Sequence, residues 1–443
     1  MHVVLLNQAF APDVVATAQM SKDLADELIA RGHTVTAIAS RSVYGQKGSV
    51  LPGRETMDGI DVRRPGVSVF GKSGYAARIA DFAFFYALAT LRLLTLKKPD
   101  VVVSFTTPPF VAGAGLLCRL LRGSRAVYWV MDLYPDLPVA CGVMKKAGPV
   151  TGFFEGVNRR LLRWSCINVV LGRCMAERVI AKGVPADKVR LIPVWADLTG
   201  ITASARDASP FRQRWNLGSD FTVMYSGNFG IGHDSRTLCE AMELLKDEPG
   251  LRFVFVGGGK RRAEVERYIK EHGIASASWQ EYVPREQLGL SLAAADVHLI
   301  SLKEGVEGIM VPSKLFGILA AGRPGIFIGH ETSEISRVLA ETNSGVTIRE
   351  GQPHLLAQAI LNLKSDPAMR AVMGENARSA VVGKYDKATA CRQWAELLER
   401  LTGAQPTRTG SGAGSASGGE ARSGSVGAGR VNSADSSASP ARA

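Results

Sequence analysis

The chain has 443 residues, of which 46% are hydrophobic, and this excludes a disordered protein and favours two globular domains. The net charge of +12 is spread over short basic clusters without interleaved aromatic residues, which argues against nucleic-acid binding. An anionic lipid surface or a phosphorylated substrate explains the charge at least as well. The six cysteines form no CxxC pair and the first residues lack a basic signal-peptide start, so we expect a cytoplasmic protein with reduced thiols.

The first half predicts a Rossmann-like domain. His2–Leu6 is a β-branched strand, and apolar residues then recur at helical spacing, at Met20, Leu24, Leu28 and Ile29, up to Gly32. Further strands are predicted at residues 34–39, 100–105 and 126–131. Alternation of strands and helices is typical of a doubly wound parallel sheet.

The second half repeats this pattern. Strands are predicted at residues 221–225, 253–256, 297–300 and 325–328, with a helix whose buried face is Leu238, Ala241, Leu244 and Leu245. We therefore predict an α/β protein of two Rossmann-like domains, residues 1–200 and 201–385, that face each other across a ligand-binding cleft. A helix over 386–402 with Trp394 is expected to return to the first domain. The Gly/Ser/Ala-rich tail 403–443 is expected to be disordered.

The stretch EGVEGIMVPSKLFGILAAGRPG, residues 304–325, contains a predicted helix. Pro312 suits a helix entry, Ser313 is an N-cap candidate, and Gly322 ends the helix before Pro324. Free amides at such an N-terminus attract anions, and Lys314 stands beside them. Most capped helices bind nothing, so this feature alone leaves phosphate binding open.

Two glycine-rich loops strengthen the case for a phosphate site. Asn228 and Gly230 follow one predicted strand, and Gly257-Gly258-Gly259-Lys260-Arg261 follows the next. Neither fits the dinucleotide fingerprint GxGxxG, and each alone is typical of an ordinary turn. Three such loops after three strands of one domain together predict a diphosphate ligand.

These segments resemble the family 4 glycosyltransferases of the GT-B fold, especially bacterial enzymes of O-antigen, colanic-acid and exopolysaccharide assembly. The similar stretches span nearly everything before Gly403: NQAFAPDVVATAQMSKDLADELIARGHTVTAI, YWVMDLYPD, YSGNFGIGHD, FVFVGGGKRR, AAADVHLISL and EGIMVPSKLFGILAAGRP. The resemblance implies transfer of a sugar from a nucleotide-diphosphate donor, UDP favoured over GDP, with retention and without a metal or cofactor. It implies donor diphosphate contacts at Asn228, Gly230, Lys260, Arg261, Pro312, Ser313, Lys314 and Leu315.

The chain departs from the family pattern at one of two acidic positions. Many relatives carry two glutamates eight positions apart, the first near the donor sugar and the second on the ribose. Glu307 corresponds to the first, although it is equally typical of a solvated loop carboxylate. Gly317 stands where the second belongs, two residues later than the spacing requires, so the ribose must be held by other groups.

Asp132 follows a strand in YWVMDLYPD and is the candidate acceptor-side residue. It would orient or deprotonate the acceptor hydroxyl, or it would merely cap a helix. Asp136 is the weaker candidate. His233 and His298 lie in the similar segments, but no metal-ligand cluster accompanies them.

The stretch 74–98 is a candidate membrane contact. Its uncharged core, residues 82–91, is too short to span a bilayer. Flanking cations and several aromatic residues suit peripheral contact with a membrane that presents polyprenyl-diphosphate-linked acceptors, and a buried helix is the alternative.

Two other functions of the whole chain stay open. One is a nucleotide-sugar epimerase or hydrolase on this fold, and the other is a non-catalytic nucleotide-sugar-binding protein.

Overall fold

The computed structural model describes residues 1–43, 50–66, 75–202 and 204–406, and the side chains of 75–79 lie outside this description. The expectation of a disordered tail therefore falls, from residue 407 on, outside the described residues, as does the beginning of the 74–98 stretch.

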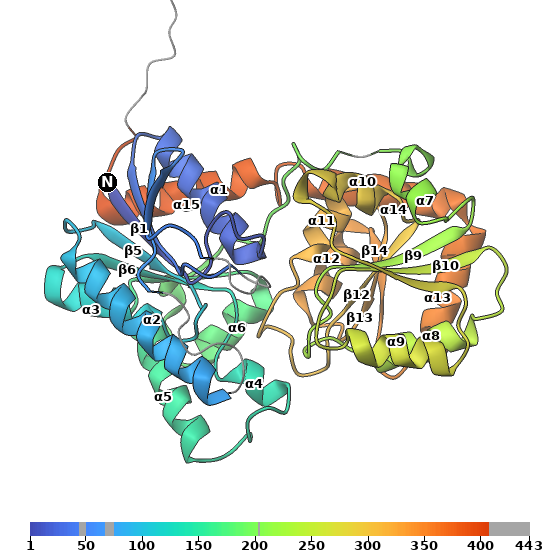
Figure 1. The fold of residues 1–443 in the computed structure, drawn as a ribbon, viewed down its shortest axis with the longest axis horizontal. Coiled ribbons are helices and arrows are strands. Elements are labelled where there is room, and N and C mark those ends of the chain that lie inside the picture. Colours follow the sequence, from blue (N-terminus) through green and yellow to red (C-terminus); the bar gives the residue numbers. More distant parts are fainter. Residues whose placement is uncertain (44–49, 67–74, 203, 407–443) are drawn as a thin grey trace, which may run out of the picture. The chain divides into compact units, whose positions relative to one another are not determined.

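The first sheet has eight strands in the order β3-β4-β2-β1-β5-β6-β7-β8 (Figure 1). Every neighbouring pair is parallel except β3 and β4. The strands are β1 His2–Leu6, β2 Thr34–Ile38, β3 Arg54–Met57, β4 Ile60–Arg63, β5 Val101–Ser104, β6 Arg125–Val130, β7 Ile167–Val170 and β8 Val189–Leu191. The four strands predicted here are confirmed to within about two residues, whereas the β3–β4 hairpin was not predicted.

Helices cover both faces of this sheet because successive side chains of a strand point to opposite faces. Val3 and Leu5 of β1 pack in one core with α1, and Val4 and Leu6 pack in another with α2 and α3. Met20, Leu24 and Leu28 of α1 are buried as predicted. The helices of this half are α1 Ala16–Ala30, α2 Tyr75–Thr95, α3 Ala112–Arg122, α4 Asp136–Ala140, α5 Pro149–Trp164 and α6 Arg173–Ala181.

The second sheet has six strands in the order β11-β10-β9-β12-β13-β14, and all its pairs are parallel. The strands are β9 Phe221–Ser226, β10 Leu251–Val256, β11 Ala277–Gln280, β12 Val297–Ser301, β13 Gly325–Ile328 and β14 Gly345–Ile348. The predicted pair of Rossmann-like parallel sheets is thus confirmed. The helices are α7 Pro210–Arg214, α8 Arg236–Leu244, α9 Arg262–Glu271, α10 Leu288–Ala293, α11 Lys314–Ala320, α12 Glu334–Thr342, α13 Pro353–Ser365 and α14 Pro367–Val381.

One helix-face prediction was wrong. Leu244 is 48% exposed, while Leu238, Ala241 and Leu245 are buried. Leu244 is the last residue of α8, where the helix has turned its buried stripe away from the side chain at this position.

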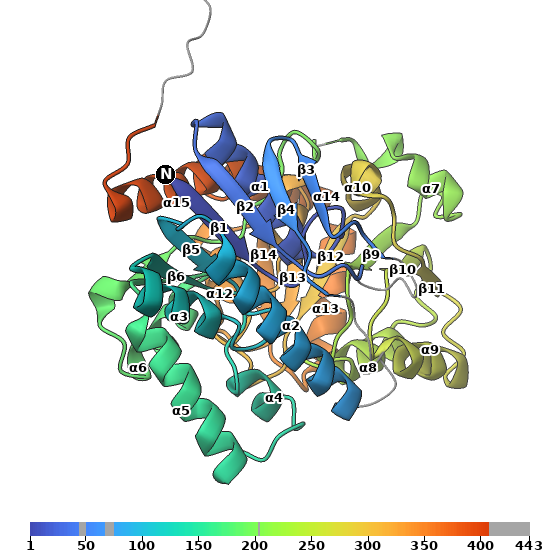
Figure 2. The same cartoon turned by 60° about the vertical axis from the view of Figure 1, so that its left-hand side comes forward.

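The final helix, α15 Lys387–Thr402, lies beside α1 of the first half (Figures 1 and 2). Trp394 is fully buried, and its ring centroid lies 4.3 Å from that of Trp129 in β6. Nε2 of His33, just after α1, lies 2.9 Å from Oε1 of Glu399. The last helix of the described residues therefore completes the core of the first half.

Candidate functional site

A cavity of about 600 Å³ opens at the carboxyl ends of the strands of the second sheet. On that side its wall consists of the loop after β9 at residues 226–228, the segment 282–285, and the first turn of α11. The facing wall comes from the first half, at residues 14–23 and 194–201. In parallel α/β sheets this edge is where ligands bind, since the loops there converge on one space.

Lys314 supplies an unmatched positive charge to this cavity. Its Nζ lies 3.6 Å from the ring centroid of Tyr225, is buried, and has no hydrogen-bond acceptor among the described residues. Burial holds the pKa of Lys314 well below its ordinary value. A buried cation without an acceptor is costly, so this position favours an anionic ligand.

The glycines around Lys314 allow two loops to pack backbone against backbone. Gly257 has φ +118°, and a Cβ there would lie 2.8 Å from the carbonyl oxygen of Gly227. The amide of Phe229 donates to the oxygen of Gly258 at 2.7 Å. Gly227 itself borders the lysine, since a Cβ on it would lie 3.6 Å from Cε of Lys314. The glycine-rich turns therefore have a structural role that the sequence analysis did not assign to them.

The other predicted phosphate contacts divide into two groups. Asn228 lines the cavity, while Gly230 does not. Arg261 lies outside its lining and donates from Nη1 to Ser235 Oγ at 2.7 Å and to Glu264 Oε2 at 3.0 Å, so much of its charge is already balanced. Lys260 is exposed and forms no ion pair with any described residue.

Three features of the start of α11 bear on anion binding, and the burial of Leu315 agrees with its place on the predicted inward face of the helix. Ser313 stands at the N-cap position, but its side chain accepts no capping hydrogen bond and its backbone is already helical, with φ −64° and ψ −21°. Leu315 has its side chain wholly buried in the core, and Pro312 has no amide hydrogen to donate. The helix has only seven residues, so its dipole is small and the charge of Lys314 dominates.

Asp132 and Glu307 lie on two segments that pair with each other, outside the lining of the cavity. The amide of Leu133 donates to the oxygen of Ile309 at 2.9 Å, and Asp132 forms a β-bridge with Met310. Burial raises the pKa of Asp132 to about 6.

The carboxylate of Glu307 is more engaged than that of Asp132. Its Oε1 accepts from the amide of Gly305 at 2.8 Å, and its Oε2 lies 3.7 Å from Nη2 of Arg178. The side chain of Glu307 is therefore held in place at the junction of the two halves, as a solvated loop carboxylate would not be.

The remaining candidates are engaged in structural contacts. Asp136 forms an ion pair with Lys182 at 2.9 Å. His233 is buried with Nδ1 against the oxygen of Ser301, and burial together with nearby Lys314 lowers its pKa to about 3. Over the described part of the chain, no group of three or more His, Cys, Asp or Glu side chains is placed to hold a metal ion.

The sequence analysis missed a polar cluster on the cavity wall. Asp23 Oδ2 accepts from Nε1 of Trp195 at 3.0 Å, and burial raises the pKa of Asp23. Nη2 of Arg285 lies 3.8 Å from Asp23 and 3.6 Å from Asp197. No sequence signal identifies this cluster, because its members come from three separate segments.

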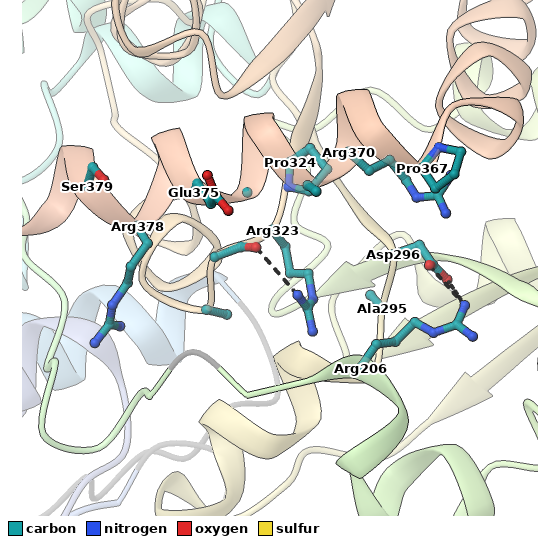
Figure 3. A pocket seen from close by; sticks show the side chains of 14 residues that line it. Arg206, Ala295, Asp296, Arg323, Pro324, Pro367, Arg370, Glu375, Arg378 and Ser379 are labelled. Atoms are coloured by element: carbon teal, nitrogen blue, oxygen red, sulfur yellow. Dashed lines mark hydrogen bonds and ion pairs between the residues drawn. The ribbon is translucent and has the colours of Figure 1, made fainter. Parts of the chain in front are cut away.

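A second cavity, of about 610 Å³, lies near the amino ends of β12 and β13 and contains four arginines (Figure 3). Arg206 donates to both carboxylate oxygens of Asp296 at 2.9 Å, and Arg323 donates to the oxygens of Ser204 and Ala293 at 2.8 and 2.9 Å. Arg378 donates to the oxygens of Ile201 and Ala320. These arginines fasten the segment that connects the two halves.

Comparisons with known proteins agree with this architecture. The family "Glycosyl transferase 4-like domain" matches residues 16–195, and "Glycosyl transferases group 1" matches residues 207–380. The chain is 25% identical over 360 residues to a protein of Escherichia coli described as the colanic acid biosynthesis glycosyl transferase WcaI, covering 79% of this chain and 88% of that protein. It is 29% identical over 272 residues to a protein of Pseudomonas aeruginosa described as the glycosyltransferase WbjE, covering 60% and 66%.

Solved structures share the fold at lower identity. Sucrose-phosphate synthase of Thermosynechococcus elongatus superposes with a TM-score of 0.76 at 16% identity, over 91% of this chain and 99% of that one. HepE of Anabaena in complex with UDP-glucose superposes with a TM-score of 0.68 at 14% identity, over 90% and 100%.

Proposed function

Because the chain belongs to the glycosyltransferases of the GT-B fold and of polysaccharide biosynthesis, we propose that it is a retaining enzyme that uses a UDP-sugar without a metal. The acceptor is a saccharide or a polyprenyl-diphosphate-linked sugar. A similar fold in HepE was solved with UDP-glucose, which supports UDP as the nucleotide.

The buried ammonium of Lys314 carries this proposal. A diphosphate placed over Gly227 and the first turn of α11 would supply the acceptor that Nζ lacks among the described residues. Exposed Lys260 would add long-range attraction, while Arg261 would contribute less because Glu264 already balances it. Asn228 would contact the phosphates from the loop after β9.

The proposed reaction exchanges one bond at the anomeric carbon for another on the same face. The bond from this carbon to the β-phosphate oxygen breaks as the acceptor oxygen bonds to the carbon. The acceptor proton passes to the departing phosphate oxygen, so a glycoside and UDP are formed. Lys314 stabilises the charge that develops on the diphosphate, which is the role of a preorganised cation in the transition state.

Asp132 and Glu307 are proposed to act beside the transferred sugar. Asp132 lies two residues after the end of β6 in the first half, and as a carboxylate it would accept a hydrogen bond from the acceptor hydroxyl and orient it. Glu307, fixed by Gly305 and Arg178, would bind hydroxyls of the donor sugar.

The ribose is proposed to lie against Gly317 and to find its polar contacts on the facing wall. A Cβ at Gly317 would meet Leu292 at 3.5 Å and Ile201 at 3.9 Å, so this side of the cavity is apolar. Asp23, Asp197 and Arg285 also line the cavity and would meet the sugar hydroxyls.

The proposed site of action is the cytoplasmic face of a membrane, with peripheral contact. Within the described ranges, no helix is long and apolar enough to cross a bilayer.

The test begins with thermal-shift measurements on the full chain with UDP, GDP, dTDP and NAD, each without metal. Stabilisation by UDP alone is expected, by about 2.7 kcal/mol at a hundredfold excess over the dissociation constant. UDP-sugars are then incubated with saccharide and lipid-linked acceptors, and NMR of the product reports the anomeric configuration. Stabilisation by NAD alone would overturn the proposal, and sugar release or epimerisation without acceptor would replace transfer by hydrolysis or epimerisation.

A further inference from the structure

Several large apolar side chains of the first half are exposed to water on adjacent helices. Leu120 and Leu121 of α3 are 81% and 61% exposed, Trp164 at the end of α5 is 62% exposed, and Leu91 of α2 is 60% exposed. None of them lines the cavity of the candidate site. Large apolar side chains gathered on adjacent helices are a feature of binding surfaces, whereas ordinary scatter leaves them isolated.

Hydrogen bonds show that these positions belong to one surface. Arg119 of α3 donates to the carbonyl oxygen of Trp164. Arg122 donates to the oxygens of Leu94 and Leu96, at the end of α2, at 2.8 and 2.6 Å. The carboxyl-terminal ends of α2, α3 and α5 therefore meet, and Figure 2 shows α3 between the other two helices.

The charged residues of this surface are almost all basic. Between Leu91 and Arg125 the sequence contains six lysines and arginines but a single acidic residue, Asp100, whose carboxylate accepts from the His2 amide at 2.6 Å. Lys97, Lys98 and Arg119 are exposed, and none of the three forms an ion pair with a described residue. We define the α3 surface as Leu91, Lys97, Lys98, Arg119, Leu120, Leu121, Arg122 and Trp164.

We propose that the α3 surface docks on an anionic lipid bilayer. Exposed leucines and a tryptophan would enter the interface between headgroups and acyl chains, and the lysines and arginines around them would meet the lipid phosphates. A protein partner is less well matched, since lysine is depleted at protein interfaces. A second copy of the chain would place these cations against one another without carboxylates to balance them.

The proposed surface overlaps the sequence-based expectation only in part, and Phe84 of the predicted stretch, which is 39% exposed, is not a member of it. Within the predicted membrane stretch, Phe85 is 5% exposed and packs in the core between α2 and the sheet, so it cannot enter a bilayer. Leu91, Lys97 and Lys98 of that stretch do belong to the α3 surface, whose remaining members lie on α3 and α5.

This inference deepens the proposed function by naming a membrane-facing surface, and it rests on that function only in supposing that the enzyme works at a membrane. The surface lies at the amino ends of β5, β6 and β7, opposite the edge of the sheet where Asp132 lies, so it would anchor the chain on the bilayer and leave the acceptor side open. The experiment is flotation of the full chain with vesicles of phosphatidylcholine, either pure or with about 30% phosphatidylglycerol. We expect binding to the anionic vesicles, and weakening by at least about tenfold in the triple variant Leu120→Ser, Leu121→Ser, Trp164→Ser. The pair Lys97→Glu and Lys98→Glu should weaken binding by a similar factor, because each cation near an anionic leaflet contributes roughly fivefold.

Matched controls come from the second half. Leu355→Ser, Val372→Ser and Val382→Ser remove side chains that are 53%, 57% and 61% exposed, and this triple variant should bind vesicles like the parent. UDP-dependent thermal shifts, measured on every variant, separate loss of folding or of the donor site from loss of membrane binding. Equal vesicle binding by the α3-surface variants and the parent would overturn the proposal. It would also be overturned if the parent ignored anionic vesicles, or formed a dimer in sedimentation that the α3-surface triple variant abolished.

Discussion

The two cavities have nearly equal volumes, about 600 and 610 Å³, but their cations differ in whether they have hydrogen-bond acceptors. The cavity with four arginines has the greater positive charge, yet Arg206, Arg323 and Arg378 each donate to Asp296 or to carbonyl oxygens, although Nε of Arg323 has no acceptor among the described residues. The other cavity contains Lys314, whose buried Nζ has no acceptor among the described residues. The comparison teaches that an unsatisfied cation, rather than a large number of cations, indicates a ligand site.

The largest effect is expected for Lys314→Met, which keeps the aliphatic chain over Tyr225 and removes the charge. The dissociation constant for UDP should rise about 100-fold, since removing one partner of a buried ion pair costs at least about 2 kcal/mol. Stability without ligand should not fall, because the buried charge is not compensated in the free protein. Calorimetric titration and urea unfolding measure both quantities, and tight UDP binding by the variant would remove the lysine from the site.

Asp132→Asn tests whether a carboxylate whose pKa is raised by burial also destabilises the free protein when it is charged. Burial raises its pKa from 3.8 to about 6, so the folded state holds the proton more tightly than the unfolded state. Stability is therefore lost as the pH rises from about 4 to about 6, and the deficit above that range is about 3 kcal/mol.

The asparagine variant should accordingly be more stable than the parent by about 3 kcal/mol at pH 8 and equally stable at pH 4. If Asp132 orients the acceptor, turnover of the parent should also fall as the pH drops through about 6. Equal stability of parent and variant at both pH values would contradict the pKa shift.

Arg323→Ala should show the opposite behaviour to Lys314→Met. It leaves the oxygens of Ser204 and Ala293 without their donor, which should lower the free energy of unfolding by about 1–3 kcal/mol. UDP affinity should stay within about twofold of the parent, since the arginine lines the other cavity. A large loss of UDP affinity with unchanged stability would reverse the roles assigned to the two cavities.

The smallest effect is expected for Lys260→Ala. Lys260 is exposed, so its attraction for a diphosphate is screened by salt. UDP affinity should fall about two- to threefold at low ionic strength, and the difference should vanish near 1 M salt, where the screening length is only about 3 Å. A salt-independent loss would place Lys260 in direct contact with the ligand.

Most of the fold was predictable because strands of a parallel sheet are short apolar runs and their helices carry a regular apolar face. The β3–β4 hairpin was missed although its turn, Asp58-Gly59, is a sequence signal for a hairpin. Both residues have positive φ, 49° and 83°, as that turn requires.

The site was less predictable than the fold because its electrostatics depend on partners from distant segments. The sequence identified Lys314, but the ring of Tyr225 and the lack of an acceptor appear only in three dimensions. The pairing of Arg261 with Glu264, in contrast, follows from their spacing of three residues and could have been inferred. The cluster of Asp23 and Arg285 has no such local signature.

The position of α15 has a consequence for building hybrid enzymes. The chain passes between the halves twice, and at these passages the amide of Ala196 donates to the oxygen of Tyr385 at 2.9 Å, and that of Lys387 to the oxygen of Ala196 at 3.0 Å. Exchanging the second half with a relative at one junction near residue 200 would place a foreign helix against Trp129. A functional chimera therefore needs two junctions, so that Trp394 stays with the first half it completes.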